Sequence, residues 1–324
     1  MWFVNPPKPP DANETNKISK SLSVITYAPV VRGKNHLPLF LSKWLHIIEI
    51  NRIVKITGKP DIVWSFDPFR FQWLKDFGAS ICIYHPVDMH PTATRQSIIS
   101  SNADFIFSTA GKILEDVGKF NNKKHLIPHG CHFSRDNTSE KIMALPGKNK
   151  IKACYIGNLY KVLDLDLILE LATKNTDVDF VFVGPTKNSN LGYVEYKEDV
   201  FNSLRARTNC FFVGEVNPDD LISYLNFADI NFVIYKELQL NPHKLMAYFY
   251  SGKVVITTPL EEYKNSSLLE VAKPGNDFLA LFDKVKNNLS YYNSFEKQKE
   301  RRDFAVKHSY SNLIDRIEGI IERG

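Results

Sequence analysis

The sequence contains no apolar run that approaches the roughly 20 residues needed for a membrane-spanning helix. Its first residues, MWFVNPPKPPDANE, carry neither a basic leader nor an apolar signal core. The four cysteines, Cys82, Cys131, Cys154 and Cys210, are far apart and form no CxxC pair, so neither a disulfide framework nor a zinc site is indicated. We therefore expect a cytoplasmic protein without a metal site, with three of these thiols buried in strands.

Acidic residues are scarce only in the first half of the chain. Residues 1–150 hold 20 Lys and Arg against 12 Asp and Glu, whereas residues 151–324 hold 21 against 24. A basic half fits a phosphate-bearing acceptor, a membrane surface or nucleic acid, and equally a solvated basic surface. Because no aromatic-interleaved basic motif is present, nucleic acid is the weakest of these. The basic amphipathic run 42–59 fits either an anionic membrane or core packing with one solvated face.

Short strand-like runs alternate with helical runs in both halves, which predicts parallel sheets with helical crossovers. The polar segment 136–150, with Pro146 and Gly147, separates them. We expect an α/β protein with an N-terminal Rossmann-like domain at 1–145 and a second one at 146–305. The proline-rich stretch NPPKPPDANETNKIS predicts an irregular loop, and EKQKERRDF predicts a charged turn between C-terminal helices.

The segment Asn241–Glu262, NPHKLMAYFYSGKVVITTPLEE, describes a loop, a helix and a buried strand. Pro242 suits the first turn of a helix because its missing N–H is not needed there. The free amides at that helix start, together with Lys244, predict a phosphate site. An ordinary solvated lysine is the alternative.

This segment resembles the pattern NPxKLxEYxAxGKPVV of the nucleotide-sugar glycosyltransferases of the GT-B fold, in particular the bacterial polysaccharide branch. The matching positions are Asn241, Pro242, Lys244, Leu245, Tyr248, Gly252, Lys253, Val254 and Val255. The tripeptide 308–310 is also similar to the His-Ser-Trp that precedes the final helix of the family. The resemblance implies two Rossmann-like domains facing a cleft, with helix 306–324 packing back on the first.

The resemblance places a nucleoside-diphosphate sugar, the donor, at the strand ends of the second domain. Glycines there allow close backbone approach, although glycine also ends many strands for turn geometry alone. The predicted donor-binding residues are Gly157, Asn158, Lys161, Gly184, Gly214, Glu215, Gln239, Asn241, His243 and Lys244. The family usually has glutamates at the positions of Gln239 and Ala247 and a basic residue at that of Asn158, so the usual carboxylates are missing.

The acceptor side requires a general base if transfer inverts the sugar carbon, and none if it retains it. Asp88, in IYHPVDMHP after a predicted strand, is the candidate base, and His85 could tune or replace it. A helix-capping aspartate is the alternative for Asp88. For His129, in LIPHG, structure and substrate contact are equally supported.

We expect a metal-independent glycosyltransferase without a cofactor. It would move a hexose-type sugar from a nucleoside-diphosphate sugar to a saccharide or lipid-linked saccharide acceptor in cell-surface polysaccharide synthesis. The expected location is cytoplasmic and peripheral, at the inner face of the membrane. The alternative is a degenerate subunit that binds a nucleotide sugar or glycan without turnover, for which the missing carboxylates are the argument.

Overall fold

The computed structural model describes residues 1–8, 14–90, 93–117, 119, 121, 123–132, 144–159, 163–185, 198–273 and 277–324. The chain divides into two compact units. We call Met1–Pro128 with Ile320–Gly324 the N-terminal unit, and His129–Gly319 the C-terminal unit. The predicted boundary at residues 145 and 146 follows a segment, 133–143, that lies outside the described residues, and it stays a prediction.

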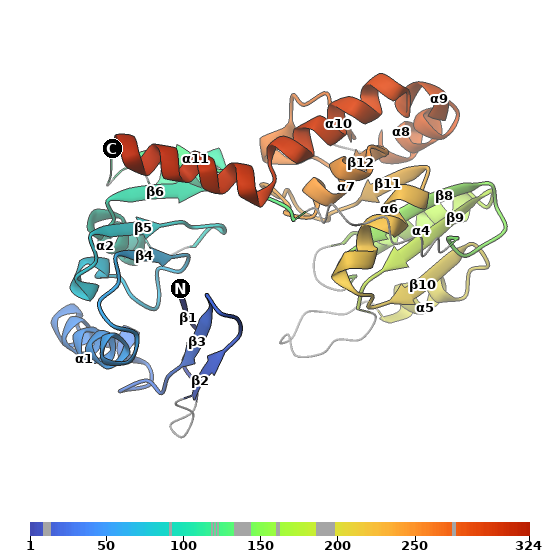
Figure 1. The fold of residues 1–324 in the computed structure, drawn as a ribbon. Helices are drawn as coiled ribbons and strands as arrows, with labels where there is room; N and C mark the ends of the chain where they lie inside the picture. The colour runs from blue at the N-terminus through green and yellow to red at the C-terminus, as the bar shows by residue number, and fades with distance from the viewer. Residues whose placement is uncertain are drawn as a thin grey trace. The chain divides into compact units, whose positions relative to one another are not determined.

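The N-terminal unit begins with a small mixed sheet of order β1-β3-β2 (Figure 1). Strand β1 (Trp2–Val4) runs parallel to β3 (Ser23–Thr26), and β2 (Glu14–Lys17) runs antiparallel to β3. The expectation of an irregular loop was therefore wrong for residues 14–17. Prolines restrict only the residues before this strand, and Glu14–Lys17 pairs along its whole length with the free edge of β3.

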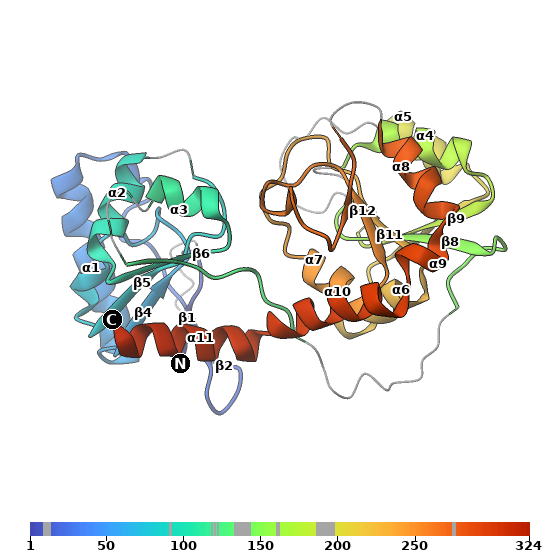
Figure 2. The same ribbon diagram turned by 90° about the horizontal axis from the view of Figure 1, so that it is seen from above.

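A second sheet of the N-terminal unit has the order β4-β5-β6-β7 and is entirely parallel, as predicted for this half. Figure 2 shows helices α2 and α3 on one side of this sheet. The strands are β4 (Ile62–Ser65), β5 (Ile81–Tyr84), β6 (Phe105–Ser108) and β7 (Lys124–Leu126). The helices are α1 (Leu39–Thr57), α2 (Ala93–Asn102) and α3 (Gly111–Val117), with the short turns η1 (Lys34–His36) and η2 (Leu74–Phe77).

The C-terminal unit is built on one parallel sheet of order β10-β9-β8-β11-β12-β13. Its strands are β8 (Ile151–Ile156), β9 (Val178–Val183), β10 (Cys210–Gly214), β11 (Ile230–Val233), β12 (Val254–Thr257) and β13 (Glu270–Val271). From β8 the chain adds strands in one direction and then returns to add β11 on the other side. The strand order thus reverses between β8 and β11, which is where open α/β sheets bind their ligands.

Helices cover both faces of this sheet, with α4, α5 and α8 on one side and α6, α7 and α10 on the other (Figure 2). The helices that follow β8 along the chain are α4 (Leu165–Lys174), α5 (Glu198–Arg205), α6 (Leu221–Phe227), α7 (Leu245–Ser251), α8 (Asp277–Lys286), α9 (Leu289–Tyr292), α10 (Phe295–Lys307) and α11 (Tyr310–Arg323), with 3-10 turns η4 (Pro218–Asp220) and η5 (Glu261–Tyr263). The expected charged turn lies inside α10 and was wrong. Arg301 in this helix is buried and donates to the carbonyls of Gly252 and Tyr292, which docks the helix.

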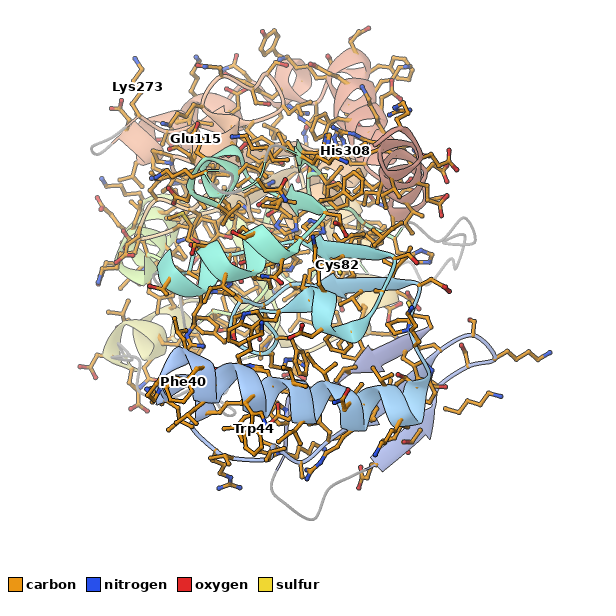
Figure 3. The ribbon with its side chains drawn as sticks, turned by 90° about the vertical axis from the view of Figure 1, so that its left-hand side faces the viewer. Phe40, Trp44, Cys82, Glu115, Lys273 and His308 are labelled. Atoms are coloured by element: carbon orange, nitrogen blue, oxygen red, sulfur yellow. The ribbon has the colours of Figure 1, made fainter. Side chains whose placement is uncertain are left out.

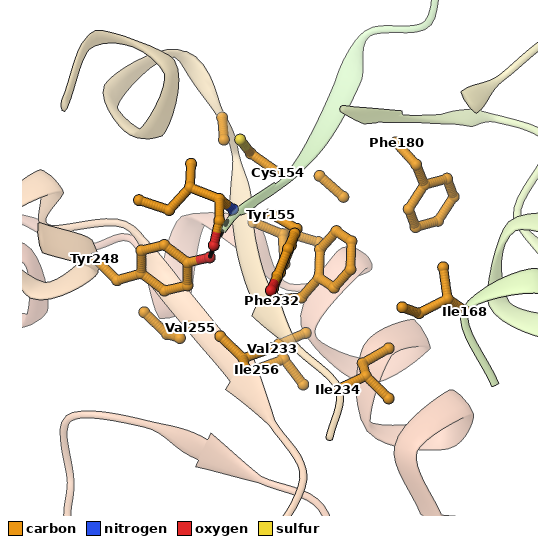
Figure 4. Close-up of a cluster of buried hydrophobic side chains, with 14 of the residues drawn as sticks. Cys154, Tyr155, Ile168, Phe180, Phe232, Val233, Ile234, Tyr248, Val255 and Ile256 are labelled. Atoms are coloured by element: carbon orange, nitrogen blue, oxygen red, sulfur yellow. Dashed lines mark hydrogen bonds between the residues drawn. The ribbon is translucent and has the colours of Figure 1, made fainter. Parts of the chain in front are cut away.

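The core of the C-terminal unit is aromatic and β-branched, because a parallel sheet is buried on both faces. Figure 4 shows Tyr155, Phe232 and Ile256 within it. The thiols of Cys82, Cys154 and Cys210 are buried as expected, and burial raises the pKa of each. Within the described ranges, none of the helices is both long and apolar enough to cross a membrane.

Candidate functional site

The predicted donor residues converge at the carboxyl edge of the C-terminal sheet. Gly157 and Asn158 follow β8, and the loop 235–244 follows β11, its direct neighbour. Gly184 follows β9 and Gly214 ends β10 on the same edge. The sheet therefore brings together residues that are up to 87 positions apart in the sequence, from Gly157 to Lys244.

Lys244 is the cation of this edge. Its Nζ lies 4.4 Å from the centre of the Tyr155 ring and 5.8 Å from that of Tyr235. It donates a 2.8 Å hydrogen bond to Tyr155 Oη, and within the described part of the chain no carboxylate pairs with it. Burial lowers the pKa of Lys244 from 10.5 to about 8, because removing the ammonium from water disfavours its charged form. Such a desolvated cation without a counter-charge is suited to an anionic ligand.

Two buried tyrosines, Tyr155 and Tyr248, both labelled in Figure 4, hold Lys244 and the turn beside it in place. Tyr155 Oη donates a 2.9 Å hydrogen bond to the Asn158 carbonyl, so one hydroxyl links the lysine to the loop after β8. Tyr248 Oη accepts a 2.8 Å bond from Ile156 N–H, which ties α7 to the end of β8. Sequence reasoning gave neither tyrosine a role. The sequence held a signal for both, since Tyr248 belongs to the matched motif and Tyr155 precedes Gly157 by two residues.

The glycines of this edge are required by geometry. Gly157 and Gly184 have φ values of 129° and 144°, and Gly214 has a φ of 86°, all in the region that side chains disfavour. Gly184 N–H donates a 2.8 Å bond to the Gly214 carbonyl. A Cβ on Gly184 would collide with the Gly157 carbonyl, and one on Gly157 with the Lys244 ammonium. The structural reason for glycine therefore holds at these positions, and the close approach of their backbone to a donor stays a prediction.

Helix α7 starts later than the sequence indicated. It begins at Leu245, so Pro242 precedes its first turn. Leu245 N–H donates to the Pro242 carbonyl at 3.1 Å, and Met246 N–H to the His243 carbonyl at 3.4 Å. The prediction that the amides of this helix start are free was wrong at these two positions, because they already have acceptors. Of the groups predicted to bind phosphate in this segment, Lys244 is therefore the one that stays a candidate. The His243 ring packs edge-on against His129, 6.1 Å between centroids.

The loop after β12 brings two glutamates to the segment that carries Gln239. Gln239 pairs with Leu260 as an isolated parallel bridge. Glu261 N–H donates to the Gln239 carbonyl at 2.9 Å, and Glu262 N–H to the Leu240 carbonyl at 3.2 Å. Sequence reasoning missed these carboxylates because they follow the next strand, and only strand pairing sets the two loops side by side.

The remaining predicted residues are not brought together by the C-terminal sheet. Lys161 lies outside the described residues. Glu215 is exposed directly after Gly214. Asp88 and His85 belong to the N-terminal unit, on the segment after β5: Asp88 is exposed, and the buried His85 ring packs against Trp64 and Phe66 with centroids 5.8 and 5.4 Å away. Their catalytic roles stay predictions. No group of His, Cys, Asp and Glu suited to a metal occurs among the residues with described positions.

Comparison with known proteins identifies the family and the fold. The family model "Glycosyl transferases group 1" matches residues 137–302. A relative from Bacillus subtilis (strain 168), the putative teichuronic acid biosynthesis glycosyltransferase TuaH, is 26% identical over 236 residues, which cover 69% of this chain and 56% of that relative. The chain thus spans little more than half the length of this curated relative.

Solved structures resemble the whole chain at low identity. Sucrose-phosphate synthase from Thermosynechococcus elongatus aligns with a TM-score of 0.73 at 12% identity, covering 99% of this chain and 88% of that one. Anabaena Alr3699/HepE in complex with UDP aligns with a TM-score of 0.67 at 11% identity, covering 94% and 86%. These likenesses establish the predicted GT-B fold of two Rossmann-like domains.

Proposed function

Since the chain belongs to the glycosyl transferases of group 1, we propose that it transfers a hexose-type sugar from a nucleoside-diphosphate sugar to a saccharide or lipid-linked saccharide acceptor. The observation that most supports this proposal concerns Lys244. This lysine is partly buried, has a lowered pKa and has no carboxylate partner among the described residues. A donor diphosphate carries about two negative charges and would supply the missing counter-charge.

The leaving group sets the chemistry that Lys244 performs. In the transfer, the acceptor oxygen forms a bond to the anomeric carbon while the bond from that carbon to the diphosphate oxygen breaks. Negative charge grows on the diphosphate as it departs, and the Lys244 ammonium stabilises that charge in a poorly solvated place. Gly157 and Gly184 let the backbone come close to the phosphates. The step uses no metal in this proposal.

Asp88 is the proposed general base. Its carboxylate would take the proton of the acceptor hydroxyl, with His85 tuning it. Asp88 is exposed on the segment after β5, so its side chain is accessible to an acceptor. Asp88→Asn replaces the carboxylate that would accept the proton by an uncharged amide of nearly the same size. We expect this variant to retain nucleotide binding and to lose transfer by at least about a hundredfold; normal turnover would refute the assignment.

Cell-surface polysaccharide synthesis is the proposed setting. The relative TuaH is named for teichuronic acid biosynthesis, and the HepE structure contains UDP. The name of TuaH supports this setting, and the UDP in the HepE structure supports a uridine nucleotide as the first donor to test. The alternative, a subunit that binds the nucleotide sugar without turnover, is favoured by the absence of carboxylates at Gln239 and Ala247.

We extend the proposal to the inner membrane surface as the place of action. Helix α1 buries Leu45, Ile50 and Ile53 and leaves Phe40 73% and Trp44 61% exposed (Figure 3). Aromatic side chains among lysines bind the interface of an anionic bilayer. Flotation with phosphatidylcholine vesicles, with and without phosphatidylglycerol, tests this. Trp44→Glu should abolish binding to the anionic vesicles, whereas Ile314→Glu, at a 51% exposed position of α11, should leave it intact.

The deciding experiment for the donor site is calorimetric titration with UDP, GDP and ADP and their common sugars. Lys244→Ala should weaken binding of the preferred nucleotide by at least about tenfold, because one charge-assisted contact is lost. Lys253→Ala is the matched control at the other end of α7. Failure of every nucleotide to bind the unmodified protein would refute the donor site. Binding without turnover over a panel of saccharides would favour the non-catalytic alternative.

A further inference from the structure

A cavity lies in the N-terminal unit, away from the donor residues in the sequence. Its volume is about 400 Å³. Three segments line it: the residues that follow β1, the loop between β3 and α1, and the residues that follow β4. β1 and β3 run parallel and the lining residues follow the last residues of both strands, so the cavity lies at the carboxyl edge of their sheet. That is the edge where ligands of α/β domains bind.

The lining of this cavity is strongly basic. Lys8, Arg32, Lys34, His36 and Arg70 contribute to it, and none of its described lining residues is acidic. The charge of Lys34 is neutralised by an ion pair with Glu49. Lys8 and Arg32, in contrast, are exposed and have no carboxylate partner among the residues described. Among the described residues, Lys8 and Arg32 therefore give the lining of this cavity an excess of positive charge.

The loop between β3 and α1 is built rigidly around a buried carboxylate. Glu49 of α1 is 1% exposed, accepts a 2.9 Å hydrogen bond from Val30 N–H and forms an ion pair with Lys34. Asn35 Nδ2 donates a 2.8 Å bond to the Phe69 carbonyl, which joins this loop to the segment after β4. Burying a carboxylate costs free energy unless it is paired and hydrogen-bonded, so these bonds favour one conformation of the loop. The cavity is preformed.

Arg70 is fixed across the cavity from this loop. Its Nη1 donates a 2.6 Å hydrogen bond to the Val4 carbonyl, and its Nε lies 3.6 Å from Asp67 Oδ2. A guanidinium has five N–H donors, so several remain for a ligand. Tyr27, 6% exposed and also in the lining, has a hydroxyl without a partner among the described residues.

We propose that this cavity binds the anionic group of the acceptor, a phosphate or a carboxylate, and so selects charged acceptors over neutral ones. The inference rests on the proposed glycosyl transfer, of which this unit would serve the acceptor side. Arginine recognises both anions through paired N–H donors, and lysine adds a point charge. The anion has two sources: the diphosphate of a lipid-linked acceptor, or the carboxylate of a uronic acid residue.

Calorimetry on the full chain tests the cavity, with Lys244→Ala as the background so that a diphosphate cannot bind through that lysine. The probes are geranyl diphosphate for the lipid source, methyl β-glucuronide for the uronic acid, and methyl β-glucoside as the neutral control. We expect one of the two anions to bind and the glucoside not to. Arg32→Gln should weaken the binding by about tenfold, as for one lost charge-assisted contact, and Lys8→Gln should weaken it less.

Arg316→Gln, at an exposed position of α11, is the control for net charge and should not change the affinity. Binding of the glucoside as tightly as the glucuronide, equal loss in Arg316→Gln and Arg32→Gln, or no binding of either anion would each overturn the proposal. The titration of UDP into the unmodified protein is a separate experiment. The donor site and the acceptor cavity can therefore fail independently.

Discussion

The Nζ atom of Lys244 lies over the Tyr155 ring, 4.4 Å from its centre, and donates a 2.8 Å hydrogen bond to the hydroxyl of the same residue. The ring face attracts the cation. The same hydroxyl donates a 2.9 Å hydrogen bond to the Asn158 carbonyl. Tyr155 itself is fully buried. A flexible lysine is thus held at the sheet edge before any ligand arrives, which reduces the entropy that binding must overcome.

Nucleotide affinity should depend on pH through Lys244. Its pKa in the free protein is about 8, and a bound diphosphate would raise it, so the ligand prefers the protonated form. Affinity should be nearly constant between pH 7 and about 8 and then fall by up to about tenfold per pH unit above that. Titrations at several pH values, in buffers of different ionisation enthalpy, should also detect proton uptake above pH 8. Lys244→Gln should bind weakly and without this dependence.

Lys244→Met should stabilise the ligand-free protein by roughly 1–3 kcal/mol near neutral pH, because burying an ammonium costs free energy that a thioether does not. The pKa of Lys244 falls from 10.5 to about 8 on folding, so above pH 8 the unfolded chain binds more protons and the unmodified protein gains stability as pH rises. The advantage of Lys244→Met should therefore be largest below pH 8 and shrink toward pH 10.5. Urea unfolding followed by circular dichroism measures it.

Gly184→Ala should destabilise the C-terminal unit more than Gly214→Ala. A Cβ at Gly184 meets the Gly157 backbone, which cannot move without disturbing β8, whereas a Cβ at Gly214 meets no atom within 4 Å. Both positions carry the cost of a positive φ, about 1–2 kcal/mol, and Gly184→Ala adds a backbone clash that should bring its total to about 2–4 kcal/mol. Equal destabilisation of the two variants in thermal unfolding would contradict this.

Glu49→Gln should destabilise the N-terminal unit by about 3–5 kcal/mol, since Lys34 is left as a buried cation without its counter-charge. The double variant Glu49→Leu with Lys34→Met should be less destabilised than Glu49→Gln, because neither charge remains. All four tryptophans of the chain, Trp2, Trp44, Trp64 and Trp73, belong to this unit. Tryptophan fluorescence during urea unfolding therefore reports on it alone, and an unchanged midpoint in Glu49→Gln would show that the ion pair is not needed.

The sequence by itself determined the order and type of most elements, the fold and the segment that carries Lys244. Helix α1, Leu39–Thr57, contains most of the amphipathic run 42–59, and strand β5 precedes Asp88 as predicted, because local periodicity and flanking breakers fix both elements. The start of helix α7 was predicted wrongly: Pro242 precedes the helix and is not in its first turn, since helix starts depend on which amides find acceptors.

Tertiary structure decided what depends on strand pairing and burial. No local sequence pattern predicts that β2 pairs with the edge of β3 or that Glu261 lies beside Gln239. Nor does a local pattern predict that Lys244 lies near the rings of Tyr155 and Tyr235. The lowered pKa of Lys244 likewise follows from the atoms packed around it. The basic cavity likewise depends on both sequence and fold. The sequence shows an excess of positive charge in the first half of the chain. Folding places Lys8, Arg32 and Arg70, from three separate segments, in the lining of one cavity. Charge is a property of composition, but its concentration at one place is a property of the fold.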